Sequence, residues 1–169
     1  VQADAMLAGI TLDTKNFAVK TGVRTFEAAA YLRRRGANTL TVKGMFSDNI
    51  ETYREKVDIV CKAHVYRGCA ISIAPSGDGD IRLASAQAAD EMLNLKGVDA
   101  SFVLFEDNNQ INISARSYGN VNVQIIMEKL GGGGHQTMAA TQLKNTTKEL
   151  AYQQLLSEID NTLDDEENS

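Results

Sequence analysis

Cysteine and long apolar runs are both scarce in this chain, and each shortage removes a class of protein. Only Cys61 and Cys69 occur among 169 residues, too few for a disulfide framework, and no signal-peptide pattern is present. We therefore expect a reduced, cytosolic setting in which both thiols, like His64, serve packing. No apolar run reaches the roughly 18 residues of a membrane span. A 43% hydrophobic and 23% charged composition instead predicts a globular domain with a real core.

Several familiar catalytic motifs are also missing. The chain has no GxSxG elbow, no Cys-His nucleophile signature and no GxGxxG after a strand, and its glycine run is not a Walker motif. His64 and His135 stand in neither an HxxxH nor a CxxC context, and Asp13 has no close carboxylate partner. A complete metal or nucleophile site therefore cannot be assembled from these motifs.

Excess positive charge is absent as well. The formal net charge is -5, which argues against strong binding to long nucleic acid because such binding depends on many phosphate contacts. Arg33–Arg35 are interpreted as a solvated helix end rather than a nucleic-acid patch. A small nucleotide in a locally basic pocket remains compatible with the acidic balance.

Four consecutive glycines, Gly131–Gly134, followed by His135 are the most informative feature that is present. A helix needs only one glycine just past its end, so a run of four is either a loose hinge or a bare backbone surface that a phosphate can approach. Because these glycines follow a helical pattern, an anion here would need positive charge from side chains. His135 could donate to a phosphate, bind a metal or act as an acid or base.

Arg116, flanked by Ser114 and Ser117, ends a predicted strand shortly before that helix. Its planar guanidinium can present paired donors to a phosphate, although a surface ion pair is the alternative reading. Asp13 follows apolar residues and is either a functional carboxylate or a cap or turn residue. We interpret the glycine run as one wall of a pocket to which His135 and Arg116 would contribute the positive charge.

Hydrophobic periodicity indicates a mixed sheet covered by helices. Thr25 is the expected N-cap of a helix over residues 26–35, and Thr146 with Glu149 is the expected capping box of the last helix. The segment after residue 8 is expected as a short separate piece over Ile10–Thr14. The expected strands lie at residues 63–66, 69–74, 100–105, 110–115 and 136–143.

Taken together, Gly131–His135, Ser114–Ser117, Gly9–Phe17 and Thr21–Leu32 resemble the DHH/DHHA1 phosphoesterase superfamily, and within it the GdpP-type cyclic di-AMP phosphodiesterases. The resemblance covers essentially the whole chain. It implies an α/β fold in which a mixed sheet of about five strands is flanked by helices, preceded by the helical tail of a DHH subdomain. The implied boundaries are a DHH remnant over 1–36, a linker over 37–47, a DHHA1 domain over 48–163 and an acidic tail over 164–169.

The resemblance also implies roles for residues. Asp13 would be one ligand of two manganese ions, but the earlier acidic and DHH motifs are absent, so no complete catalytic site is expected in this chain. The expected phosphate-binding residues are Ser114, Arg116, Ser117, Gly132, Gly133, Gly134 and His135.

The function implied is the substrate-binding C-terminal part of a manganese-dependent enzyme that hydrolyses cyclic di-AMP to linear pApA, with the fragment alone inactive. Two alternatives stay open: a nano-RNase acting on short oligonucleotides, and a non-catalytic RNA- or nucleotide-binding module. The family further implies a cytoplasmic domain of a membrane-anchored parent whose DHH, sensory and membrane segments this chain lacks. Apolar helix faces permit a homodimer without requiring one.

Overall fold

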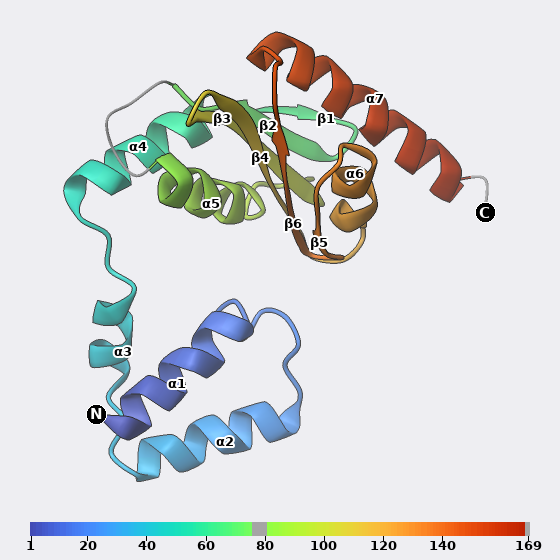
Figure 1. Cartoon of the computed structure of the whole chain (residues 1–169). Coiled ribbons are helices and arrows are strands. Elements are labelled where there is room, and N and C mark those ends of the chain that lie inside the picture. The colour runs from blue at the N-terminus through green and yellow to red at the C-terminus, as the bar shows by residue number, and fades with distance from the viewer. Residues whose placement is uncertain (76–80, 168–169) are drawn as a thin grey trace. The chain divides into compact units, whose positions relative to one another are not determined.

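The structure is a computed structural model that describes residues 1–75 and 81–167. The chain divides into two compact units, Val1–Asn49 and Ile50–Ser169 (Figure 1). Across the described residues no helix combines the length and the apolar character needed to cross a membrane.

The first unit is helical, with α1 at Gln2–Asp13, α2 at Val23–Arg34 and α3 at Thr39–Met45. Its small core joins Leu7, Leu32, Ala37 and Val42. The expectation of a separate segment at Ile10–Thr14 is wrong, because α1 continues through Asp13. The linker expected over 37–47 stays a prediction, although Ala37 and Val42 lie in this core.

Both predicted helix caps are displaced by one to three residues. Gly22 is the N-cap of α2, and Thr25 is the third helical residue, whose hydroxyl accepts a hydrogen bond from Gly22 N at 3.3 Å. At the last helix the hydroxyl of Thr147, not Thr146, accepts from Leu150 N at 3.3 Å. Glycine and hydroxyl residues are all accepted at N-caps, and the local backbone decides between nearby candidates.

The second unit holds a six-stranded mixed sheet in the order β1-β2-β3-β4-β6-β5. The β2–β3 pair is parallel and the other pairs are antiparallel. The elements are α4 Ile50–Cys61, β1 His64–Tyr66, β2 Cys69–Ile73, α5 Ile81–Met92, β3 Ala100–Asp107, β4 Gln110–Ser117, α6 Val123–Lys129, β5 Gly133–His135, β6 Met138–Leu143 and α7 Lys148–Glu167.

The predicted mixed sheet flanked by helices is confirmed, with six strands where about five were expected. The additional strand is β5, which lies inside the glycine run interpreted as a loop. Glycine carries no side-chain alternation, so no periodic signal announces this strand in the sequence.

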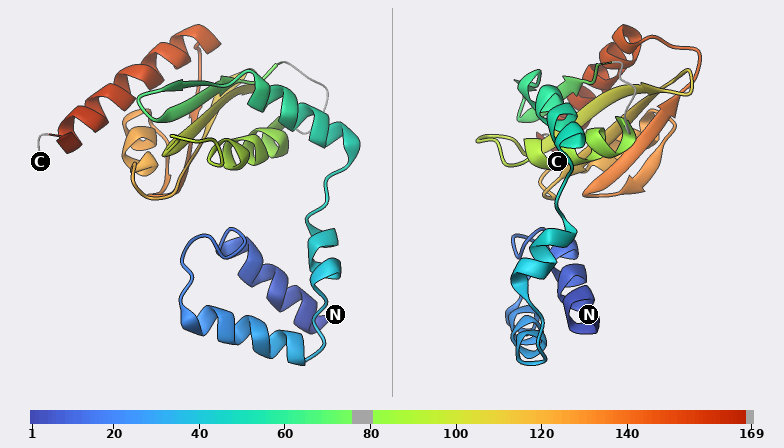
Figure 2. Two further views of the ribbon diagram at one scale, coloured as in Figure 1. Left: turned by 180° about the vertical axis from the view of Figure 1, so that it is seen from behind. Right: turned by 90° about the vertical axis from the view of Figure 1, so that its left-hand side faces the viewer.

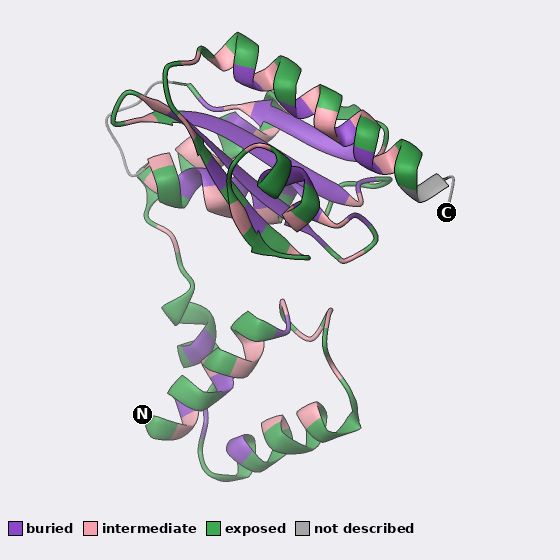
Figure 3. Cartoon of the chain, turned by 45° about the vertical axis from the view of Figure 1, so that its right-hand side comes forward, coloured by how far each residue is buried: buried purple, intermediate pink, exposed green. Residues whose placement is uncertain are grey.

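Helices cover the sheet on both faces, as the two further views make clear (Figure 2). One core cluster packs Phe102, Ile113 and Ala139 of the sheet against α6 and α7. The other packs Ala70 and Val103 against α4 and α5. The buried residues accordingly concentrate in the strands (Figure 3).

The sheet face that packs against α4 and α5 is left partly open at β6. Met138, Ala140 and Gln142 are exposed, whereas Ala139 and Thr141, which point to the α6–α7 side, are buried. Since side chains alternate between faces along a strand, β6 has one covered face and one solvent-facing face. We call the solvent-facing side of β6 and β5, with the adjoining side chains of β4, the open face.

Candidate phosphate-binding face

The strand register brings Arg116 and His135 to the open face. Met138 of β6 pairs with Arg116 of β4 on one side and with His135 of β5 on the other. Directly paired residues share a face, so the two predicted phosphate ligands flank Met138 on one side of the sheet. Two strand spacings separate their backbones, about 10 Å, a gap that both side chains can narrow toward one anion.

Local contacts hold the Arg116 guanidinium in place. Nη1 donates to Ser114 Oγ at 3.2 Å and to Ala115 O at 2.9 Å, and the residue is only 9% exposed. Nε lies 3.4 Å from Asp90 Oδ2 of α5, close enough for an ion pair, yet it makes no aligned hydrogen bond. Within the described part of the chain Nη2 has no hydrogen-bond partner and is not fully enclosed. A preorganised cationic donor is therefore presented to the open face.

The two serines beside Arg116 lie on opposite sides of the sheet. Ser114 shares the Arg116 face and accepts from its Nη1. Ser117 pairs with Ala100 of the α6–α7 core, and its hydroxyl donates to Gln136 O at 3.3 Å and accepts from Gly119 N at 3.1 Å. Ser117 thus ties the loops near β4 together and is not brought onto the open face.

The four glycines differ in what the fold requires of them. Gly131, with φ +78°, follows the end of α6 in the left-handed conformation that glycine favours. A Cβ on Gly132 would come within 2.2 Å of Ala140 O, and one on Gly134, at φ +148°, within 2.5 Å of Ala139 Cα. Close approach of β5 to β6 therefore requires glycine at both positions.

Gly133 is different. A Cβ there would meet nothing within 4 Å, and its φ lies outside the range that only glycine tolerates well. Gly133 pairs with Ala140, so its missing side chain lies on the open face. Because packing does not demand this glycine, its bare backbone is available for close approach by a ligand at an edge strand.

Asp13 lies in the first unit, exposed at the end of α1. No group of three or more His, Cys, Asp or Glu side chains able to hold a metal ion occurs among the described residues. One carboxylate does not satisfy a manganese ion, which takes several oxygen or nitrogen ligands.

His64, Cys61 and Cys69, which were predicted to serve packing, lie in different environments. His64 Nε2 lies 2.8 Å from the Tyr152 hydroxyl and links β1 to α7. Cys69 is fully buried, and burial raises the pKa of its thiol to about 12. The packing prediction is wrong for Cys61, which is exposed at the end of α4.

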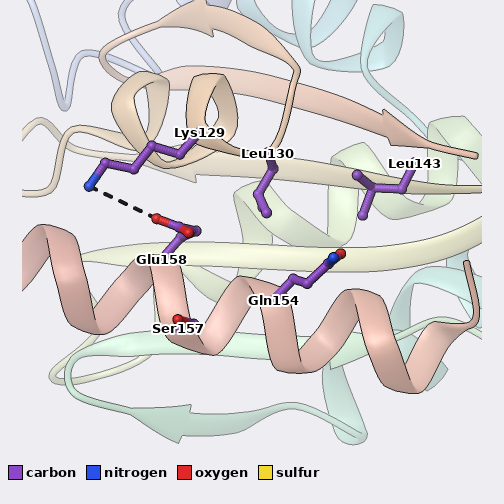
Figure 4. A pocket seen from close by; sticks show the side chains of 6 residues that line it. All are labelled: Lys129, Leu130, Leu143, Gln154, Ser157 and Glu158. Carbon is purple, nitrogen blue, oxygen red and sulfur yellow. Dashed lines mark ion pairs between the residues drawn. The ribbon is translucent and has the colours of Figure 1, made fainter.

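A separate hollow of about 300 Å³ lies on the opposite side of the sheet (Figure 4). Lys129 supplies its only cationic side chain, and Lys129 Nζ lies 3.9 Å from Glu158 Oε2. The hollow is lined by Lys129, Leu130, Leu143, Gln154, Ser157 and Glu158.

The sequence analysis did not identify two features of the open face, and only one of them has a signal in the sequence. Asp90 is 26 positions from Arg116 in the chain (116 − 90), and nothing local in the alanine-rich helix signals their contact. The polar side of β4 could have been found, because Asn112, Ser114 and Arg116 alternate with Ile111, Ile113 and Ala115. That alternation also separates Ser114 from Ser117.

Comparison with known proteins adds a family to this geometry. The family profile described as the DHHA1 domain matches residues 68–165. The chain is 48% identical over 162 residues to the cyclic-di-AMP phosphodiesterase PdeA of Listeria monocytogenes and 44% identical over 161 residues to the cyclic-di-AMP phosphodiesterase GdpP of Geobacillus thermodenitrificans. These alignments cover 95% and 94% of this chain but 25% and 24% of the relatives, so the chain spans about a quarter of their length.

A solved structure supports the fold. An exopolyphosphatase-related protein from Bacteroides fragilis superposes with a TM-score of 0.79 at 18% identity, covering 96% of this chain and 49% of that one. At this identity the likeness concerns the fold alone.

Proposed function

Because this chain belongs to the DHHA1 domain family, we propose that it is the substrate-binding part of a phosphodiesterase acting on cyclic di-AMP. Relatives named for that activity align with nearly the whole chain at 44–48% identity. Because the chain spans only about a quarter of those relatives, the activity is assigned to a longer protein and substrate binding to this part.

One observation carries the proposal: Arg116 offers Nη2 on the same open face as His135 and Gly133. A phosphate placed there would accept from the Arg116 guanidinium, whose orientation Ser114 Oγ and Ala115 O already fix. Such charge-assisted bonds are the stronger ones. Gly133 would let the phosphodiester approach the backbone, and His135 would supply a further donor from β5.

Hydrolysis itself is proposed to need residues beyond these. Manganese would activate water for attack on phosphorus, and Asp13 would contribute one ligand to such a site. Because the described residues do not complete that site, we expect this chain to bind cyclic di-AMP without turning it over. In the longer protein the product would be linear pApA, and a membrane anchor would be supplied by that protein's other segments.

Calorimetric titration of the 169-residue chain with cyclic di-AMP tests the proposal. Arg116→Ala should weaken binding by at least tenfold, since hydrogen bonds to charged groups contribute about 1.5–3 kcal/mol. Arg54→Ala is the matched control because it removes the same charge from an exposed position on α4. Equal affinities in the two variants would reduce Arg116 to a structural residue.

The same titration separates the alternative functions. Tighter binding of linear dinucleotides than of cyclic di-AMP would favour the nano-RNase, and binding of longer RNA at low salt would favour the RNA-binding module. Substantial hydrolysis of cyclic di-AMP by this chain with manganese would contradict the division into binding and catalytic parts.

A further inference from the structure

The open face carries a second group of polar side chains, which lies further along β4 and β6 from Arg116. Three rows of directly paired residues cross it, and they run from a charged end through a middle of small residues to an amide end. The rows are Arg116–Met138–His135, Ser114–Ala140–Gly133 and Asn112–Gln142.

Asn112 is held in a defined orientation at the amide end. Its Nδ2 donates to Gln110 O at 3.3 Å, which assigns nitrogen and oxygen within the amide. The residue is only 5% exposed, yet Oδ1 has no partner among the described residues and is not fully enclosed. An oriented acceptor with unused capacity in a nearly buried side chain is suited to a ligand.

Gln142 lies opposite Asn112 on β6 and is exposed. Its amide adds donors and an acceptor next to Asn112 Oδ1. The middle row leaves room between the two polar ends, because Ala140 is small and the space beside Gly133 is open.

The dimensions match one nucleotide. Asn112 and Arg116 are four positions apart, about 13 Å along a strand, and the Arg116 and Gln142 side chains can narrow that distance. Such a distance is of the order of that from the phosphate of an extended nucleotide to the far edge of its base. The small middle row would accommodate the sugar.

We propose that Asn112 and Gln142 bind the base edge of one nucleoside whose phosphate lies at Arg116 and His135. The inference rests on the proposed function for the phosphate position and adds a base-recognising subsite to it. An amide presents an acceptor beside a donor, the pattern that pairs with the amino group and ring nitrogen of adenine. Adenine is the base of the proposed ligand and presents this pattern, so the subsite is assigned to adenine.

A pair of ligands isolates the contribution of the base. AMP and ribose 5-phosphate share phosphate and sugar, so the ratio of their dissociation constants for the full 169-residue chain, measured by NMR titration, reports base recognition alone. Wild type should bind AMP more tightly than ribose 5-phosphate. Gln142→Ala should weaken AMP about tenfold and leave ribose 5-phosphate unchanged, whereas Gln153→Ala, at an exposed position on α7, should change neither.

Each outcome separates this subsite from the function on which it rests. An AMP preference that survives Gln142→Ala and Asn112→Ser, or no preference in wild type, overturns the base subsite. If Arg116→Ala still weakens both ligands in that case, the phosphate site stands. If neither ligand nor cyclic di-AMP binds wild type, both proposals fail. Gln142 is exposed, so its variant keeps the test valid even if Asn112→Ser does not fold.

Discussion

The two sides of β4 are both withdrawn from solvent, but their chemistry is opposite. Ile111, Ile113 and Ala115 face the α6–α7 core, with exposed fractions of 0–4%. Asn112, Ser114 and Arg116 face the other way and are 5–9% exposed. Burial alone therefore does not distinguish a core from a site. The difference lies in the neighbours, since the polar side adjoins the solvent-facing residues of β6 and retains donors and acceptors that the fold does not use.

The largest expected effect comes from the apolar side. Ile113→Ala should lower the free energy of unfolding by about 2–5 kcal/mol, because it removes a fully buried side chain and leaves a cavity. Urea denaturation measures this loss, and titration under native conditions should show unchanged affinity for cyclic di-AMP. A loss below about 1 kcal/mol would mean that this side is not the closely packed one.

Within strand β5, two neighbouring glycines are expected to respond differently to substitution by alanine. Gly134→Ala should destabilise the chain by more than about 1 kcal/mol, since its Cβ would collide with Ala139 and φ is +148°. Gly133→Ala should leave stability equal or raise it by up to about 1 kcal/mol, because alanine reduces unfolded-chain entropy. It should nevertheless weaken cyclic di-AMP binding.

The pair is measured by thermal denaturation alongside ligand titration. A stable Gly133→Ala variant with wild-type affinity would remove Gly133 from the proposed site. A fully stable Gly134→Ala variant would contradict the close approach of β5 to β6.

A smaller effect is expected from Arg116→Lys. Lysine keeps the charge but loses the planar fork that bonds Ser114, Ala115 and a ligand together. Affinity for cyclic di-AMP should fall about tenfold, equivalent to about 1.4 kcal/mol, with stability changed less than by Ile113→Ala. Full affinity in this variant would show that charge alone, without orientation, accounts for binding.

The last prediction needs no substitution and concerns the reactivity of the two thiols. Cys61 is exposed, whereas burial raises the pKa of the Cys69 thiol to about 12, so Cys69 stays protonated at pH 7–9. One thiol should react with a colorimetric disulfide reagent in the native chain and both in denaturant. Rapid reaction of two thiols under native conditions would contradict the closed α6–α7 side of the sheet.

Periodicity of apolar residues in the sequence predicted most of the regular helices and strands. Strands β3 and β4 and the helix before the glycines lie near the positions expected for them, because apolar residues recur there with a clear spacing. Strand β5 was missed because glycines give no such signal. Thr25 and Thr146 were misassigned as caps because local backbone geometry chooses among candidates within a few residues of each other.

Part of the candidate site was equally accessible from sequence. Arg116, Ser114 and His135 were singled out, and the register places them on one face. The different requirements at Gly132, Gly133 and Gly134 depend on strand packing, and the Arg116–Asp90 ion pair depends on tertiary contact. Neither has a local sequence signal.

Methyl NMR of the chain titrated with cyclic di-AMP locates the binding face, because neighbouring methyl groups on β6 report opposite faces of the sheet. We expect shifts and ligand contacts for the Met138 and Ala140 methyls, with the Ala139 and Ala115 methyls little affected. Changes centred on Ala139 and Ala115, or on Leu130 and Leu143 of the opposite hollow, would contradict binding at the open face.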